Sequence, residues 1–139
     1  MRFWDTSAVV SLLMEQPVSE RARELAREDP EIVAWWGTPA ECRSVAARLR
    51  REGVLTLEDE DVVHTLLGAL GMAWLEVLPS EEVRAQAGRL VRVHAVRASE
   101  ALQIAAASVW AGSPPLGDFV TFDARLSDVA RLEGFNVVS

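Results

Sequence analysis

Four acidic residues occupy positions in the chain where they could act together. Two of them follow predicted strands, over residues 2–4 and 119–122, and two lie in the first turns of predicted helices. They are Asp5, Glu41, Glu100 and Asp123. Clustered carboxylates, with waters, are the ligands by which proteins hold Mg²⁺ or Mn²⁺. These residue types therefore predict a metal site, provided that the fold brings them to one place.

Each of these acids also has a purely structural explanation. Asp5 and Asp123 could cap the helices that follow them. Glu41 could be the reciprocal member of a capping box that Thr38 opens, and Glu100 could be an acid favoured by the helix dipole. Asp5 is embedded in apolar strand residues, however, and Glu100 begins the otherwise uncharged run 101–112. Acids that border buried segments are costly without a partner, and a cation would offset that cost.

Three hydroxyl residues stand next to the predicted strand ends. Thr6 and Ser7 follow the first acid, and Thr121 precedes the last. Their hydroxyls could orient the carboxylates or bind a metal-bound water. They could equally be N-cap and strand residues.

The elements that must position these acids alternate between short apolar runs and helical patterns. Strands are predicted at residues 2–4, 32–35, 74–78, 119–122 and 136–138, and helices at 8–14, 18–28, 38–53, 57–70, 81–93, 99–110 and 124–132. Strands that are apolar on both faces are typical of a mostly parallel sheet covered on both sides. We therefore expect a three-layer α/β fold with a central sheet of about four to five strands. Sites in such folds lie beyond the carboxyl ends of the strands, so the acids are expected to converge there.

Composition excludes several classes of chemistry. All 14 Lys and Arg positions are arginine, which removes the lysine of a P-loop or a Schiff base, and tyrosine is absent. The single cysteine, Cys42, excludes an intrachain disulfide. The net charge of −7 makes global attraction to nucleic acid weak, so a polyanionic substrate would need metal ions or local arginines. No apolar run approaches a membrane span of ~20 residues, and we expect one cytoplasmic domain over 1–139.

Five segments, in order and at fitting distances, carry a resemblance to a known family. They are Phe3–Ala8, Thr38–Glu41, Arg97–Ala107, Phe119–Leu126 and Ala130–Val138. The chain resembles a PIN-domain ribonuclease of the VapC-like kind, the toxin of type II toxin–antitoxin pairs. The resemblance covers essentially the whole chain and implies a PIN-like three-layer fold. It also implies that Asp5, Glu41, Glu100 and Asp123 hold one or two divalent metals, Mg²⁺ or Mn²⁺.

The resemblance implies an activity and partners as well. The reaction would be hydrolysis of RNA phosphodiester bonds by a metal-activated water. The protein would form a homodimer or a higher homo-oligomer and would bind a small antitoxin protein. Trp74, Leu66 and Leu67 either contribute to such a surface or, as we expect, pack in the core. One departure stands out: the third acid is usually Asp in this family and is Glu100 here. Asp118 is a possible supplementary acid.

Two other functions stay open on the sequence alone. The chain could be a catalytically weak or inactive PIN-like binding module, as the exchange at Glu100 would favour, or a metal-dependent nuclease acting on DNA. Several residues likewise keep two interpretations. The arginines of the 38–53 helix and Arg97 are either solvated or phosphate contacts. Trp35 and Trp36 either pack at a strand end or stack on bases. His64 and His94 have no ligand-spaced partner and are interpreted as structural.

Overall fold

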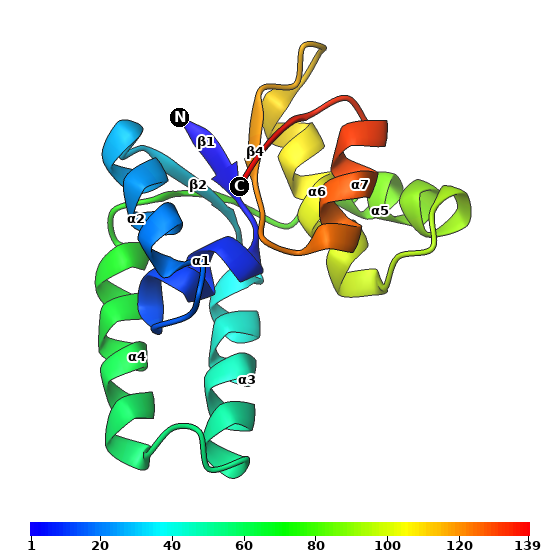
Figure 1. Ribbon diagram of the computed structural model, residues 1–139. Coiled ribbons are helices and arrows are strands. Elements are labelled where there is room, and N and C mark those ends of the chain that lie inside the picture. Colours follow the sequence, from blue (N-terminus) through cyan, green and yellow to red (C-terminus); the bar gives the residue numbers. More distant parts are fainter.

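The computed structural model describes residues 1–139 and contains one central sheet in which all strands are parallel (Figure 1). The strands are β1 (Arg2–Trp4), β2 (Ile32–Trp35), β3 (Leu75–Val77), β4 (Asp118–Val120) and β5 (Asn136–Val138). Their order across the sheet is β3-β2-β1-β4-β5. Phe3 of β1 is in register with Val33 of β2 and with Phe119 of β4, so β1 lies at the centre. The predicted parallel three-layer α/β architecture is confirmed.

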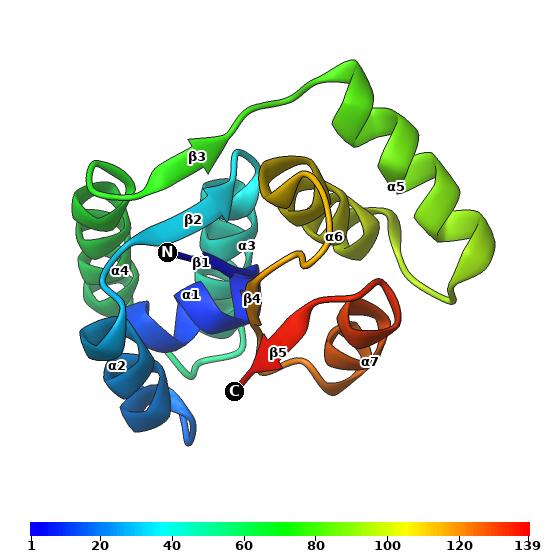
Figure 2. The ribbon, with the colours of Figure 1, turned by 90° about the horizontal axis from the view of Figure 1, so that it is seen from above.

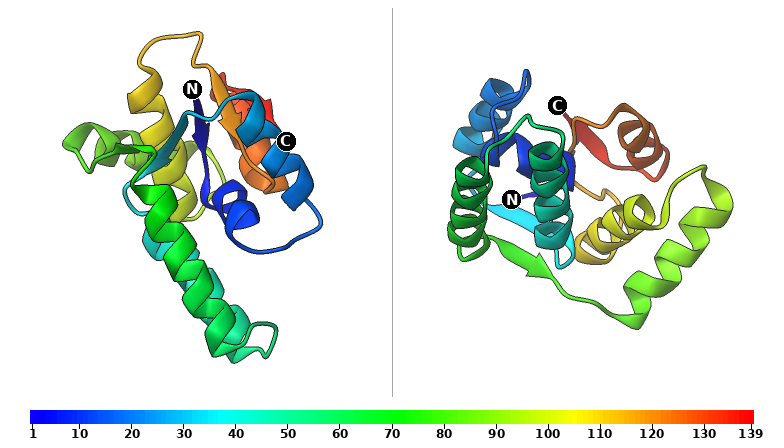
Figure 3. Two further views of the ribbon diagram at one scale, coloured as in Figure 1. Left: turned by 90° about the vertical axis from the view of Figure 1, so that its left-hand side faces the viewer. Right: turned by 90° about the horizontal axis from the view of Figure 1, so that it is seen from below.

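Helices cover both faces of the sheet, as the view from above shows (Figure 2). One face carries α1 (Thr6–Leu13), α2 (Ser19–Glu28), α3 (Thr38–Arg51) and α4 (Leu57–Gly71). The other face carries α5 (Glu81–Val93), α6 (Ala98–Ala111) and α7 (Ala124–Leu132). Helices α3 and α4 form an antiparallel pair that extends away from the sheet (Figures 1 and 3).

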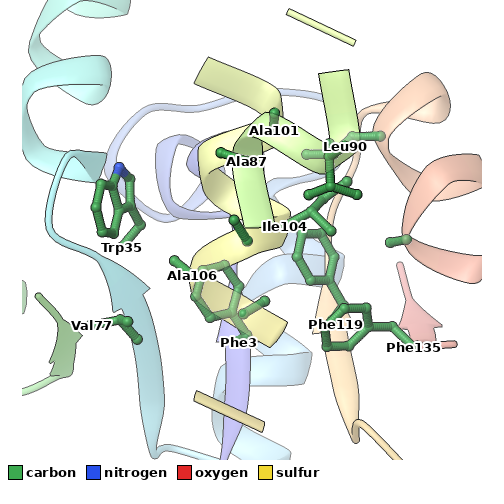
Figure 4. Close-up of a cluster of buried hydrophobic side chains, with 14 of the residues drawn as sticks. Phe3, Trp35, Val77, Ala87, Leu90, Ala101, Ile104, Ala106, Phe119 and Phe135 are labelled. Carbon is green, nitrogen blue, oxygen red and sulfur yellow. The ribbon is translucent and has the colours of Figure 1, made fainter. Parts of the chain in front are cut away.

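The strands divide their side chains between two hydrophobic cores, because successive residues of a strand point to opposite faces. Phe3 and Phe119 stack at 5.4 Å between ring centroids on the face of α5, α6 and α7 (Figure 4). Trp4 and Val120 point to the opposite face, toward α1 and α3. Both faces of the central strands are thus buried, which explains their continuous apolar sequences.

Helix α6 contributes more buried residues than any other helix. Ala101 and residues 103–107 are shielded from solvent, as the near absence of polar residues predicts. Small alanine side chains let α5 and the sheet approach α6 closely. Gln103 is the one polar residue among these buried positions, and it is 2% exposed.

The strand predicted over 119–122 is shorter in the structure and ends at Val120. At this point side-chain hydroxyls, rather than a neighbouring strand, accept the hydrogen bonds of the backbone amides. Ser7 Oγ accepts a hydrogen bond from the Phe122 amide at 2.9 Å, and Thr121 Oγ1 accepts one from the Asp123 amide at 3.1 Å. Thr121 and Phe122 therefore lie outside the strand, between β4 and α7, and Asp123 does not follow the strand directly as predicted. None of the helices combines the length and the apolar character needed to cross a bilayer.

Candidate active site

A polar pocket of ≈ 560 Å³ opens beyond the carboxyl ends of β1, β2 and β4. Only five of its 17 lining residues are hydrophobic. All four acids singled out in the sequence line it: Asp5, Glu41, Glu100 and Asp123. The helices α1, α3, α6 and α7 all begin at this edge of the sheet. Their N-terminal ends carry partial positive charge toward the pocket and favour acids there.

Asp5 is the most deeply buried of the four acids, with 3% of its surface exposed. Its Oδ1 accepts hydrogen bonds from Ser7 Oγ at 2.7 Å and from the Ala8 amide at 3.0 Å, which caps α1. Burial raises the pKa of Asp5 to about 6, and the hydrogen bonds from Ser7 and Ala8 reduce that rise. The structural role as a cap and the place in the pocket coexist in this residue.

Ser7 ties Asp5 to the segment that follows β4. The same Ser7 Oγ that donates to Asp5 lies 3.3 Å from Thr121 Oγ1. Thr121 is 1% exposed and accepts from the Asp123 amide. Asp123 in turn caps α7, since its Oδ1 accepts from the Leu126 amide at 2.9 Å. One chain of hydrogen bonds therefore fixes the backbone of both strand-end acids.

Glu41 is not part of a capping box, contrary to that expectation. Gly37 occupies the N-cap position of α3, and Thr38 is the first helical residue, fully buried. The Glu41 carboxylate instead reaches across the pocket: Oε2 accepts from Thr6 Oγ1 at 3.0 Å and Oε1 accepts from Gln103 Nε2 at 3.2 Å. Burial raises the pKa of Glu41, opposed by these two hydrogen bonds.

Gln103 is a site residue that the motif search did not single out. Its Nε2 donates to Thr6 Oγ1 at 2.8 Å and to Thr38 Oγ1 at 3.1 Å, besides Glu41. Its Oε1 is buried without any hydrogen-bond partner, and Gln103 lines the pocket. The signal in the sequence was its isolation: a lone amide in an alanine-rich run, three residues after Glu100 and on the same helix face.

Glu100 is held differently from the other acids. Its Oε2 accepts from the Arg97 amide at 2.8 Å, and its Oε1 accepts from Arg125 Nη2 at 2.7 Å. Arg125, on the first turn of α7, is a second residue that the sequence search did not single out. Its cationic side chain pairs with the one acid that departs from the family pattern.

The remaining candidates lie away from the pocket or have other partners. Asp118 begins β4 at the opposite edge of the sheet and binds Arg2 and Asn136. His94 contacts Glu133, and Cys42 is buried in the core, where burial raises its pKa to about 12. These residues are structural, as expected for the histidine. Among the candidate surface residues, Leu66 is exposed, whereas Leu67 and Trp74 belong to the core.

The donor set of the pocket fits a hard divalent cation. Carboxylate, hydroxyl and amide oxygens are the ligands that Mg²⁺ and Mn²⁺ prefer. Two acids with raised pKa values, the buried Asp5 and the half-buried Glu41, have no cationic partner, and Gln103 Oε1 has no hydrogen-bond partner at all. No three Asp, Glu, His or Cys side chains stand close enough to hold one ion in this arrangement. The acids would have to turn toward an ion in order to share it.

Comparison with known proteins adds evidence on the fold. No protein-family model and no curated protein sequence matches the chain. Among solved structures, FitAcB from Neisseria gonorrhoeae superposes with a TM-score of 0.69 at 21% identity, covering 100% of this chain and 97% of the other. Mycobacterium tuberculosis VapC20, a sarcin–ricin-loop-cleaving toxin, gives 0.69 at 16% identity over 92% and 94%. FitAB bound to an IR36 DNA fragment gives 0.68 at 19% identity over 99% and 94%.

These neighbours are PIN-domain toxins, and the chain shares their PIN-like fold over nearly its whole length. The expected fold, an all-parallel sheet between two layers of helices, is thereby confirmed.

Proposed function

We propose that the protein is a metal-dependent endoribonuclease that hydrolyses RNA phosphodiester bonds as the toxin of a toxin–antitoxin pair. The observation that carries the proposal is the single pocket lined by Asp5, Glu41, Glu100 and Asp123 at the carboxyl edge of a PIN-like sheet. The sarcin–ricin-loop-cleaving toxin among the structural neighbours supports RNA as the substrate.

Asp5 and Glu41 are the acids best suited to hold Mg²⁺ or Mn²⁺, with Asp123 and Glu100 completing the set. When bound, the metal supplies Lewis-acid stabilisation of the phosphodiester and lowers the pKa of an attacking water. The chain's own hydroxyls keep the acids in place: Ser7 orients Asp5, and Thr6 orients Glu41. Arg97 lines the pocket without an ion-pair partner and can contact a substrate phosphate. No side-chain nucleophile is needed.

The proposed toxin function also implies protein partners. We propose a small antitoxin protein as a partner, which the likeness to FitAB, seen bound to DNA, supports. We also propose a homodimer or a higher homo-oligomer. Leu66 of α4, which is 45% exposed, is the member of the candidate surface that is open to a partner, and Val62 on the same helix is 57% exposed.

A non-catalytic binding module is the second candidate, and the state of Glu100 favours it. An acid paired with Arg125 and capping its own helix is less free to bind a metal than a carboxylate open to the pocket. Metal binding separates the two candidates, because a module without catalysis has no need of a cation at Asp5.

The decisive experiment is Mn²⁺ and Mg²⁺ titration by calorimetry, with cleavage of matched single-stranded RNA and DNA on the same samples. We expect the parent protein to bind metal and to cleave RNA, and Asp5→Asn to do neither. Asp61→Asn, which removes an exposed acid of α4, is the matched control and should behave like the parent. Absence of metal binding at millimolar Mn²⁺ or Mg²⁺ would contradict the proposed nuclease function. Cleavage of DNA in place of RNA would change the proposed substrate to DNA.

A further inference from the structure

Trp36 is left in solvent at the edge of the sheet that carries the acids. Of the five tryptophans, Trp4, Trp35 and Trp74 are buried, whereas Trp36 is 55% exposed. It directly follows β2, and its amide donates to Val77 O at 3.0 Å, which fixes the backbone beside the end of β3. A large exposed aromatic side chain on a fixed backbone is a candidate for recognition, because burial would otherwise stabilise it.

The orientation of the Trp36 indole is fixed by its contact with Trp35. Trp35 packs edge-to-face against it, with 6.4 Å between ring centroids and 71° between ring planes. Trp35 in turn lies over Gly37, where a Cβ atom would stand 2.5 Å from Trp35 Nε1. Only glycine leaves room for this stack, so the Trp-Trp-Gly sequence sets the orientation of the exposed ring.

Hollows flank Trp36 on two sides. One, of ≈ 320 Å³, is shared with Leu102 of α6, and the other, of ≈ 400 Å³, with Pro39 and Arg43 of α3. The first turns of the same two helices contribute Glu41 and Glu100 to the acidic pocket. The exposed ring therefore stands next to the acidic pocket, separated from it by the starts of α3 and α6.

Arg43 supplies a positive charge at this place that takes part in no salt bridge, although Glu76 lines the same hollow. Ion pairs occupy its helix neighbours Arg48 and Arg50, and Arg84 beside the other hollow pairs with Glu81. Arg43 forms no salt bridge with any acidic side chain. In a chain of net charge −7, an unpaired cation beside an exposed indole is a local exception.

We propose that Trp36 and Arg43 form a subsite for one unpaired nucleotide of the RNA, next to the position of cleavage. The base stacks on the indole, and a neighbouring phosphate binds the guanidinium. The inference rests on the proposed nuclease function. An aromatic face accepts any base and requires that the base be free of a duplex, so the substrate class is single-stranded or looped RNA. The charged lining of the second hollow, Arg43 and Glu76, is less suited to an apolar protein surface.

The test compares variants of the full chain in Mn²⁺-dependent cleavage of a short single-stranded RNA. We expect Trp36→Ala to raise KM about tenfold and to leave kcat within about twofold, because base–aromatic stacking is lost outside the reacting atoms. Trp36→Phe retains a ring and should stay close to the parent. Met72→Ala removes a side chain that is 91% exposed near the opposite end of β3 and serves as the matched apolar control.

Binding of the same RNA in EDTA, where hydrolysis is stopped, gives a second readout by fluorescence anisotropy. Trp36→Ala should lower the affinity for this RNA about tenfold but leave the affinity for an abasic strand of equal length unchanged. Arg43→Ala should lower the affinity for both strands, whereas Arg51→Ala, at the far end of α3, should lower the affinity for neither. Equal effects of Trp36→Ala on both strands, or none, would overturn the subsite.

Two further outcomes are informative. A change of oligomeric state in Trp36→Ala, seen by light scattering, would overturn the proposal and assign the residue to a protein interface. A parent protein that neither binds nor cleaves RNA would overturn the nuclease and the subsite together. Cleavage by the parent with unchanged KM in Trp36→Ala would overturn the subsite alone.

Discussion

Thr6 Oγ1 donates a hydrogen bond to Glu41 Oε2 at 3.0 Å, and this contact joins the first turn of α1 to the first turn of α3. Gln103 Nε2 reaches the same two side chains from α6, at 2.8 Å from Thr6 Oγ1 and 3.2 Å from Glu41 Oε1. Three helices that start at the same sheet edge are therefore linked through one hydroxyl, one amide and one carboxylate. The geometry of Glu41 depends on residues from all three helices.

Gln103→Leu should test this link. The substitution keeps the side-chain volume but leaves buried Thr38 Oγ1 and Glu41 without their amide donor, so we expect a loss of about 1–3 kcal/mol in the free energy of unfolding. Metal affinity or cleavage should fall by about 10- to 100-fold, because an orienting partner of a ligand is removed. Ser108→Ala, later on the same helix, is the control. Parent-like metal binding by Gln103→Leu would show that Glu41 needs no support.

Asp5→Asn should make the metal-free protein more stable at neutral pH. The pKa of Asp5 is raised from 3.8 to about 6, so the ionised carboxylate penalises the folded state. Stability of the parent should therefore fall as pH rises from about 4 to 6 and then level off, with a total penalty of up to about 3 kcal/mol. Asparagine can still cap α1. Urea unfolding should give Asp5→Asn an advantage at pH 7.5 that disappears at pH 3.5; an equal difference at both pH values would contradict the burial penalty.

Metal affinity should rise with pH over the same interval. Burial raises the pKa values of both Asp5 and Glu41, and a cation binds their ionised forms. Mn²⁺ titrations between pH 5 and 7.5 should show weak binding at the acidic end and a plateau above the pKa of Asp5. Added Mn²⁺ should stabilise the parent and not Asp5→Asn. Binding that does not change with pH would mean that neither acid is a ligand.

Arg125→Ala should remove the ion pair that holds Glu100 and leave its carboxylate free to bind a metal. The guanidinium lies 2.7 Å from Glu100 Oε1 and competes with any cation for that oxygen. We expect the Mn²⁺ concentration for half-maximal cleavage to fall several-fold, by about 1 kcal/mol of binding free energy for a half-exposed pair. Arg131→Ala, in the last turn of α7, removes a charge of the same sign that pairs with Asp128 and is the control. A higher Mn²⁺ requirement would instead give Arg125 a supporting role.

Gly37→Ala should disturb the start of α3. The new Cβ would stand 2.5 Å from Trp35 Nε1, so the indole or the backbone must shift. We expect a loss of about 1–3 kcal/mol in the free energy of unfolding, which is typical of overpacking. Gly88→Ala has open space around its Cβ and is the control. Near-ultraviolet circular dichroism should report the displaced tryptophan pair in Gly37→Ala only, and identical stability in the two variants would contradict the close packing.

Much of the fold followed from local patterns. The predicted strands over 32–35 and 136–138 and the helices over 81–93 and 124–132 match the structure, because apolar runs and caps such as Ser80 act over a few residues. The predicted ends of elements were wrong where a side chain distant in the sequence forms the local hydrogen bonds. Ser7 ends β4 early, and Thr38 is a buried first residue of α3 rather than its N-cap.

The sequence by itself determined which acids stand at the starts of helices, because those positions follow from local periodicity and capping chemistry. It also determined the parallel sheet, since strands apolar on both faces need helices on both sides. Only the tertiary structure decided which donor serves each acid. The pairs of Glu41 with Gln103 and Glu100 with Arg125 span 62 and 25 positions of the chain. Such contacts depend on how helices pack across the sheet, and no local pattern encodes that packing.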